Sequence, residues 1–555
     1  MTDTPFTLER GKRLSESLLW RLQQKFFDNL GAEAWTQGIV PHYITGNRWI
    51  AGAYAKVVLG WLRDCSGPAR EPRSFPPLDL RHPVTLLELG CGSGRFGYLF
   101  FERLLDLLGR SSLSHVAVRY VMTDFTEKNL EPLRRHPALQ PWIEQGILDF
   151  ARYDASADGE IRLERSGEVL GPWSLRNPLV VLANYVFDGI PQDAFAVRGG
   201  RLHELLATLT VPDEEEDLED PTILQRVEVS WEERPAADEP YGDPELDSIL
   251  KEYAQGLSDT AVLFPIAAIR CLRHLGRLAD SRLLLVSGDK GYCREELLAG
   301  RDAPVLSIHG SFSLMVNYHA MGRWLAHQGG EILCTSHIHS SLCVVAGLLG
   351  TPPGGSIETR LAFDEAIERT GPDDFFDLKV GFGHAYDDLT LEHLLAWVRL
   401  SGWDASVLLG CWPALMKHAP AAAGVFRLEI YRTVHEVWGH YFPLSEARDL
   451  AFHLGVLLCE IDCHGDALPF FHESMAVYGP NPATIFNVGL CLYHLGHLEE
   501  ARQHVNQALE GAPDFEPALE LRKEIAAALR PARKKKQGPK RLQGHQGHKK
   551  RPQSP

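Results

Sequence analysis

The chain has 555 residues, of which 45% are apolar and 23% charged, so it is long enough for two to four domains with hydrophobic cores and is not dominated by disorder. Its 10 cysteines stand singly, without a C-x-x-C pair, which argues against a disulfide scaffold or a zinc ribbon and favours a reducing, cytoplasmic compartment. The net charge is −17, the N-terminus is charged where a signal peptide is apolar, and no window reaches the roughly 18 apolar residues of a membrane span, so no membrane partner is expected.

The first part of the chain has helical periodicity. Apolar residues recur at helical spacing over 13–35 and 47–63, on either side of the turn-prone stretch GIVPHYITGN. We therefore expect residues 1–67 to form an N-terminal helical cap or lid, whose Trp and Phe side chains belong to a core. The Pro-rich residues 68–83 are typical of a linker into a sheet.

Strand-like and helix-like segments alternate through residues 84–350. The expected strands cover residues 84–90, 116–124, 146–154, 179–187 and 281–288, and the expected helices cover 95–108, 126–135 and about 245–278. This alternation predicts an α/β fold with a Rossmann-like, doubly wound parallel sheet. The acidic residues 212–220 interrupt the pattern, and we expect a solvated loop there.

The pattern becomes helical after the cluster TPPGGS, and a helical connector is expected over 357–447. Residues 448–529 then show a 34-residue period. The equivalent small residues are Gly455 and Gly489, Ala467 and Ala501, and Ser474 and Ala508. These positions resemble the tetratricopeptide repeat, a helix-turn-helix whose stacked copies offer a concave surface to a protein substrate or assembly partner. A helical bundle with an accidental period is the alternative.

The last 26 residues, 530–555, hold ten Lys or Arg and no acid. Residues 1–529 therefore contain 46 basic and 73 acidic side chains, a net charge of −27. The tail has little apolar surface to bury, so we expect it to be disordered. It offers a surface for nucleic acid or an acidic partner, although a solubilising tail explains the same composition.

A glycine-rich loop is the most informative segment. In LLELGCGSGRFGYLF a strand ends at Glu88 and leads into Gly90, Gly92 and Gly94 before a helix begins. Glycines allow the turn to double back and let a ligand approach the main chain, and the helix presents unpaired N–H groups. The string G-x-G-x-x-G also occurs, ending at Gly97, so a dinucleotide site and a nucleoside-sulfonium site are both open at this point.

Acidic residues at strand ends favour the second kind of site. Glu88 stands in E-x-G-x-G-x-G, which resembles motif I of class I S-adenosylmethionine-dependent methyltransferases. The resemblance implies that Glu88 supports the loop, that Asp124 accepts the ribose hydroxyls and that Asp154 faces the adenine amino group of S-adenosyl-L-methionine. Three acids at successive strand ends suit a ligand with a diol, an exocyclic amine and no phosphate.

The segment LVVLANYVFDGIPQDAF narrows the resemblance to the MidA family of methyltransferases, which includes complex I assembly factors that dimethylate an arginine. Residues 41–62 resemble the lid segment of that family, which implies a cofactor contact for Thr45, and residues 308–342 loosely resemble its late region. The sequence departs from the family at Cys91, where a Pro is usual, and at Tyr185, where a Glu is usual. Loss of that Glu leaves the methyl acceptor open, because a carboxylate would bind a guanidinium bidentately.

The proposed catalytic group is Asp188, with Asn184 and Tyr185, placed to orient an acceptor nitrogen and take up its proton. The competing interpretation of Asp188 is a helix N-cap. No metal site is expected. His337 and His339 are interpreted as a structural or surface pair on one face of a strand.

Cys459, Cys463 and His464 are interpreted as packing residues, because C-x-x-x-C-H lacks a second ligand pair.

The motifs of the whole chain together predict methyl transfer to a nitrogen of a protein that the helical repeats recruit. The alternatives are an assembly factor that holds the cofactor without turnover, and a small-molecule methyltransferase whose repeats serve oligomerisation.

Overall fold

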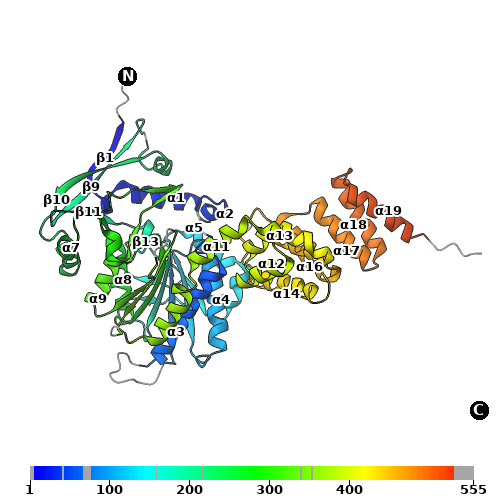
Figure 1. Cartoon of the computed structure of the whole chain (residues 1–555), viewed down its shortest axis with the longest axis horizontal. Helices are drawn as coiled ribbons and strands as arrows, with labels where there is room; N and C mark the ends of the chain where they lie inside the picture. Colours follow the sequence, from blue (N-terminus) through cyan, green and yellow to red (C-terminus); the bar gives the residue numbers. More distant parts are fainter. Residues whose placement is uncertain are drawn as a thin grey trace, which may run out of the picture. The chain divides into compact units, whose positions relative to one another are not determined.

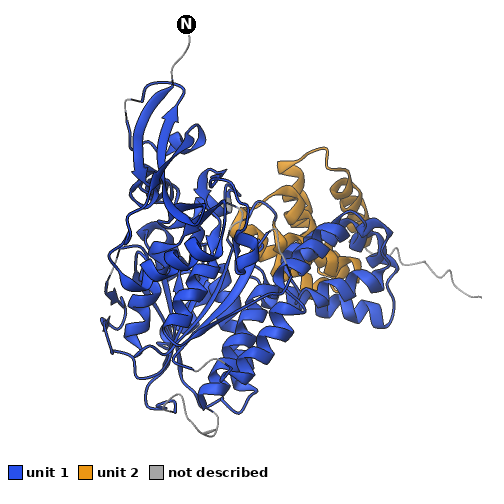
Figure 2. Cartoon of the chain, turned by 60° about the vertical axis from the view of Figure 1, so that its left-hand side comes forward, with its two compact units in different colours: residues 1–448 blue, residues 449–555 orange. Residues whose placement is uncertain are grey.

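The computed structural model describes residues 5–40, 43–66, 77–157, 159–215, 217–337, 341–351, 354–444 and 446–530. The chain divides into two compact units, residues 1–448 and residues 449–555 (Figure 2). Most of the expected linker over 68–83 and the basic tail beyond Arg530 lie outside the described residues. In the part of the chain that is described, no helix is both long and apolar enough to cross a membrane.

A seven-stranded sheet forms the centre of the first unit (Figure 1). Its strands, in spatial order, are β17 (Glu331–Cys334), β18 (Cys343–Leu349), β12 (Leu283–Asp289), β7 (Leu179–Asn184), β2 (Val84–Leu89), β3 (Val118–Asp124) and β4 (Leu148–Arg152). The pairs from β12 to β4 are parallel, whereas β18 runs antiparallel to both of its neighbours. The α/β prediction is confirmed.

Helices cover both faces of this sheet, which explains why its strands read as continuous apolar runs. α3 (Arg48–Ser66) and α4 (Arg95–Gly109) lie on one side, and α8 (Ile266–Leu278) and α9 (Tyr318–His327) on the other (Figure 1). Along β2, Val84 and Leu86 join the core under α3 and α4, while Leu87 joins the core under α8 and α9. Buried side chains therefore alternate between two cores across one strand.

A second, antiparallel sheet lies beside α1 (Leu18–Leu30). It contains β1 (Phe6–Arg13), β9 (Arg201–Val211), β8 (Asp193–Arg198) and β11 (Thr260–Phe264), with β10 (Glu228–Pro235) on β9. The expected helical cap over residues 1–67 therefore begins with a strand, which the sequence analysis did not predict. β1 pairs with β9, from Phe6 opposite Val211 to Arg13 opposite Leu206. Because its partner lies so far along the chain, the sequence around β1 contains no hairpin pattern that would predict this strand.

The single helix expected over about 245–278 is also interrupted. α7 (Pro244–Gly256) ends before β11, and α8 begins only after Pro265. The segment TAVLF is fully buried and pairs antiparallel with β8, so tertiary pairing overrides the helical periodicity on either side. The described part of the acidic segment 212–220 contains no helix or strand and is mostly exposed.

The remaining elements of the first unit are short or helical. Between the main strands lie α2 (Glu33–Thr36), α5 (Glu127–Arg135), α6 (Gln140–Glu144), β5 (Ile161–Arg162), β6 (Val169–Leu170), β13 (Gly291–Tyr292), β14 (Ser307–His309), β15 (Ser311–Ser313) and β16 (Val316–Asn317). The helices after the sheet are α10 (Ile357–Phe363), α11 (Pro372–Gly383), α12 (Leu391–Leu400), α13 (Ala405–His418) and α14 (Val425–Gly439). α10 packs on α3, so this region belongs to the first unit.

The second unit is helical throughout its described residues. Its helices are α15 (Leu450–Glu460), α16 (His464–Tyr478), α17 (Pro482–His494), α18 (Leu498–Gly511) and α19 (Glu516–Ala528). A Cβ at Gly455 would lie 2.8 Å from the Phe471 ring, and a Cβ at Gly489 would lie 2.9 Å from Val505. Both glycines, 34 residues apart, thus let the two helices of a pair approach closely.

Candidate functional site at the carboxyl ends of the strands

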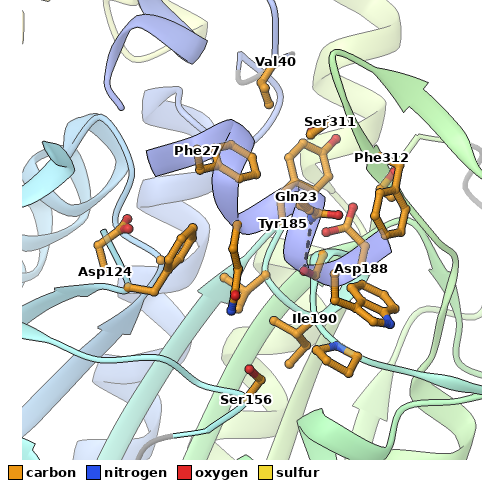
Figure 3. Close-up of a pocket in the computed structure, with 18 of the residues that line it drawn as sticks. Gln23, Phe27, Val40, Asp124, Ser156, Tyr185, Asp188, Ile190, Ser311 and Phe312 are labelled. Carbon is orange, nitrogen blue, oxygen red and sulfur yellow. Dashed lines mark hydrogen bonds between the residues drawn. The ribbon is translucent and has the colours of Figure 1, made fainter. Parts of the chain in front are cut away.

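A cavity of about 200 Å³ lies where the parallel strands of the central sheet end (Figure 3). Its wall comes from the loops after β2, β3, β4, β7 and β12, from α1 and from residues 307–313. The strand order reverses between β2 and β7, and ligands of open α/β sheets bind in the crevice at such a reversal. The lining includes Gly90, Asp124, Phe125, Asp154, Ser156, Tyr185, Asp188, Lys290, Ser311 and Phe312.

The glycine loop after β2 needs residues without a side chain. Gly90, Gly92 and Gly94 have φ of 59°, 50° and 74°, the left-handed region that favours glycine. A Cβ at Gly92 would lie 3.1 Å from the Trp35 ring. Of the three, Gly90 lines the cavity, while Gly92 and Gly94 shape the loop behind it.

Glu88 lies beneath this loop rather than in the cavity wall. Its carboxyl is buried and accepts a hydrogen bond of 2.9 Å from the Tyr120 hydroxyl. Burial raises the pKa of Glu88 to about 8. A Cβ at Gly97 would collide with this carboxyl, so the last glycine of G-x-G-x-x-G is explained by packing against Glu88.

Asp124 joins the loop to the cavity. It is the last residue of β3, and its carboxylate accepts hydrogen bonds from the backbone N–H groups of Gly92 (3.0 Å) and Thr126 (3.1 Å). Burial raises its pKa to about 6, while these hydrogen bonds oppose the shift. The same carboxylate faces the cavity beside Phe125.

Asp154 lies on the same side of the cavity, after β4. Its Oδ1 accepts from the N–H (2.8 Å) and the hydroxyl (2.7 Å) of Ser156, and its Oδ2 accepts from Gln24 of α1 at 3.2 Å. These contacts fix the orientation of the carboxylate and tie α1 to the sheet edge.

The turn after β7 forms the other side of the cavity. Tyr185 has φ of 52°, a strained conformation for a bulky residue, and its N–H donates to the Gly288 carbonyl at 3.0 Å. Its ring and the Asp188 carboxyl both face the cavity (Figure 3). Asn184, by contrast, does not line it, and its Oδ1 accepts from the Tyr54 hydroxyl of α3 at 2.7 Å.

Asp188 lies inside the 3-10 turn Phe187–Gly189. The residue at the N-cap position is Val186, and no side chain caps the turn, so Asp188 is not a helix N-cap. Its carboxyl is buried and contacts Asp289, the last residue of β12. Burial raises the pKa of Asp188 to about 6, and burial together with the Asp188 charge raises the pKa of Asp289 well above its usual value. Two buried carboxyls in contact share one proton, because both cannot ionise without large repulsion.

Asp289 and Lys290 did not emerge from the sequence. Asp289 accepts a hydrogen bond of 2.7 Å from the Tyr318 hydroxyl, which leaves it anchored behind Asp188. Lys290 lines the cavity, and its charge lowers the pKa of Asp188 against the effect of burial. A signal was present, since an acid directly follows the expected strand over 281–288, just as Asp124 ends another strand.

Aromatic side chains of the N-terminal helices cover the cavity. Trp20, Phe27 and Trp35 line it, which corrects their assignment to a core alone. Phe27 stacks on Trp35 with ring centroids 5.6 Å apart and contacts Phe125 edge-on at 6.2 Å. Gln23 donates to the Gly189 carbonyl at 3.1 Å, so α1 is fixed to the turn that carries Asp188.

Two further expected positions lie elsewhere. Thr45 is buried in the turn before α3 and does not line this cavity. His337 follows β17 instead of lying in a strand, and its Nδ1 is 3.8 Å from the Glu368 carboxylate. His339 lies outside the described residues.

No protein-family model and no curated protein sequence matches the chain. Among solved structures, it is similar to an uncharacterized protein from Burkholderia thailandensis, with 13% identity and a TM-score of 0.36 over 60% of this chain and 87% of that chain. A second protein from this organism, bound to S-adenosyl-homocysteine, has 14% identity and a TM-score of 0.35 over 55% of this chain and 77% of that chain. The 1,6-didemethyltoxoflavin-N1-methyltransferase of this organism, with S-adenosylhomocysteine bound, has 10% identity and a TM-score of 0.27 over 62% of this chain and 93% of that chain.

Proposed function

We propose that the chain is an S-adenosyl-L-methionine-dependent methyltransferase of the class I, MidA-like kind, with a Rossmann-like catalytic domain. One observation carries the proposal: the glycine loop at Gly90, the strand-end acids Asp124 and Asp154, and the turn with Tyr185 and Asp188 all meet around a single cavity. The first three would hold the cofactor, and the turn would face the methyl acceptor.

The polar groups suit an adenosine-like ligand better than a dinucleotide. Asp124 offers a carboxylate to a ribose diol, Phe125 offers an aromatic face, and Asp154 with Ser156 can meet the adenine amino group. Lys290 is the only Lys or Arg among the described residues that line the cavity, so a pyrophosphate would meet carboxylates in place of cations.

When bound, the cofactor supplies an electrophilic methyl group on a sulfonium, whose thioether leaves without protonation. The residues of the chain have two tasks: to hold the acceptor nitrogen in line and to accept its proton. Positioning contributes roughly 7–11 kcal/mol to such reactions. Asp188 is placed to accept the proton, because Lys290 favours its ionised form and the protonated Asp289 stabilises it by a hydrogen bond.

The acceptor in this proposal is a nitrogen of a protein in the cytoplasm, recruited through the tetratricopeptide-like helices α15–α19. Paired helices with small residues at their contacts offer an extended surface, which a small acceptor would not need. Tyr185, in place of the Glu usual in the family, argues for an acceptor other than a bidentately bound guanidinium.

Calorimetry tests the cofactor site directly. The full chain should bind S-adenosylmethionine and S-adenosylhomocysteine but not NAD, and Gly92→Leu should abolish binding, because the side chain would meet Trp35 at a positive φ. Gly109→Leu is the matched control, since its Cβ has no neighbour within 4 Å. Undiminished binding by Gly92→Leu would contradict the site.

Transfer of a labelled methyl group in a cell lysate tests the reaction and its acceptor. Label should enter protein. Label found only in small molecules would favour the small-molecule enzyme, and cofactor binding without any transfer would favour an assembly factor.

A further inference from the structure

Three side chains that can ligate metals converge in the second unit. Cys459 lies in the last turn of α15, His464 begins α16, and Cys491 lies in the last turn of α17. Their ligand atoms all lie within 4.8 Å of one another, and the two sulfurs are 3.4 Å apart. Three helices from two successive helix pairs therefore contribute to one cluster.

The surroundings hold these groups in place. Cys491 is completely buried, Cys459 is half-buried, and the Nδ1 atom of His464 is buried. The His464 ring stacks on His494, with centroids 4.1 Å apart and an angle of 7° between the planes. Stacking fixes the orientation of the imidazole before any ligand arrives.

The separation of the sulfurs fits coordination better than a disulfide. A disulfide requires about 2.05 Å between sulfurs. Two sulfurs that each lie about 2.3 Å from one tetrahedral zinc are roughly 3.8 Å apart, which is close to the observed spacing.

We propose that Cys459, His464 and Cys491 bind one Zn²⁺ ion, with water in the fourth tetrahedral position. Two thiolates and an imidazole are typical ligands of Zn²⁺, whereas Mg²⁺ and Ca²⁺ prefer oxygen ligands. On binding, both thiols lose their protons to solvent and the imidazole binds through a neutral nitrogen.

The site also has a structural rationale. Two helix pairs and one capping helix are fewer than the three repeats that stacked helical modules usually need. A metal that links α15 and α16 to α17 ties the first pair to the second, so metal binding adds to the stability of the second unit. This proposal is independent of the methyltransferase assignment.

Titration of the full chain with Co²⁺ tests the proposed Zn²⁺ site. After chelation under reducing conditions, one equivalent of Co²⁺ should give thiolate-to-cobalt charge-transfer absorption and visible bands of tetrahedral intensity, and Zn²⁺ should displace it. Cys459→Ser and Cys491→Ser should each weaken Co²⁺ binding at least tenfold. Cys411→Ser is the matched control, because Cys411 is a buried thiol of α13 in the first unit and should leave the spectrum unchanged.

The wild-type spectrum keeps the test decisive if a variant fails to fold. Absence of the charge-transfer band from the folded wild-type chain would overturn the proposal, and so would an unchanged band in both variants. A Cys459–Cys491 disulfide that persists in the reduced chain, detected by mass spectrometry of the joined peptides, would overturn it as well.

Discussion

Asp188 and Asp289 form the buried acid pair at the end of β7 and β12, and the chemistry proposed for the cavity depends on which of them is ionised. Asp289 is held by Tyr318 and has the higher pKa, so the shared proton resides there. Asp188 faces the cavity with Lys290 nearby. The pair thus separates one carboxylate for proton uptake from one carboxylic acid for support.

Asp188→Asn removes the proposed base while it preserves the shape of the side chain. Single-turnover methyl transfer should fall about 10²-fold or more, in line with the loss of a positioned base. S-adenosylhomocysteine affinity measured by calorimetry should change little, because the proposed function places Asp188 beside the methyl acceptor and not beside the cofactor. Asp213→Asn, an exposed substitution, is the control. A variant at residue 188 with normal single-turnover rate would leave this carboxyl without a catalytic role.

Asp289 should control the pH dependence of the reaction. Asp188 must be ionised to accept a proton, and its pKa of about 6 predicts that the rate falls as the pH drops below about 6. Asp289→Ala removes a hydrogen bond that favours the ionised form, so the acidic limb of the pH–rate profile should move to higher pH. Asp289→Asn can still donate that bond and should move the limb less. Identical profiles for both variants would separate Asp289 from the titration of Asp188.

At the scale of elements, the sequence predicts the five parallel strands of the central sheet, but neither its antiparallel strands β17 and β18 nor the second sheet. The strands β2, β3 and β7 are buried on both faces, so their continuous apolar runs mark them directly. β1 is half-exposed and pairs with a strand about 200 residues away, so no local pattern reveals it.

The same difference of scale applies to the two sites. Asp124 could be predicted because it ends a strand next to the glycine loop, whereas the contact of Asp188 with Asp289 depends on β7 and β12 being neighbours, which only the fold supplies. The Cys459 and Cys491 sulfurs lie 32 residues apart in the sequence, so a search for short ligand spacings misses them.

The aromatic cover formed by α1 and α2 should contribute to cofactor affinity. Trp35 packs over Gly92 and stacks on Phe27, so Trp35→Ala should weaken S-adenosylhomocysteine binding about tenfold, which corresponds to roughly 1.4 kcal/mol. Trp49→Ala is the matched control, because Trp49 stacks on Phe375 and does not line the cavity. Tighter binding by Trp35→Ala would show that the ring occupies the ligand's place instead of covering it.

At the scale of the whole molecule, all residues that line the cavity belong to the first unit, and Cys459, His464 and Cys491 all belong to the second. A chain that ends after residue 448 should therefore keep its affinity for S-adenosylmethionine within a few-fold while protein methylation falls. Calorimetry and labelled-methyl transfer on the truncated and full chains measure the two effects. Loss of cofactor binding by a truncated chain that is folded by circular dichroism would mean that both units build one site.

The pairing of β1 with β9 affects how the protein folds during its synthesis. Residues 6–13 leave the ribosome before their partner, residues 206–211, which follows about 200 residues later. At the usual 5–20 residues per second, the first strand waits roughly 10–40 seconds for its partner. During that interval α1 cannot pack on the second sheet, because β8, β9 and β11 all come later in the chain. The aromatic cover therefore reaches its final position only after that sheet has been synthesised.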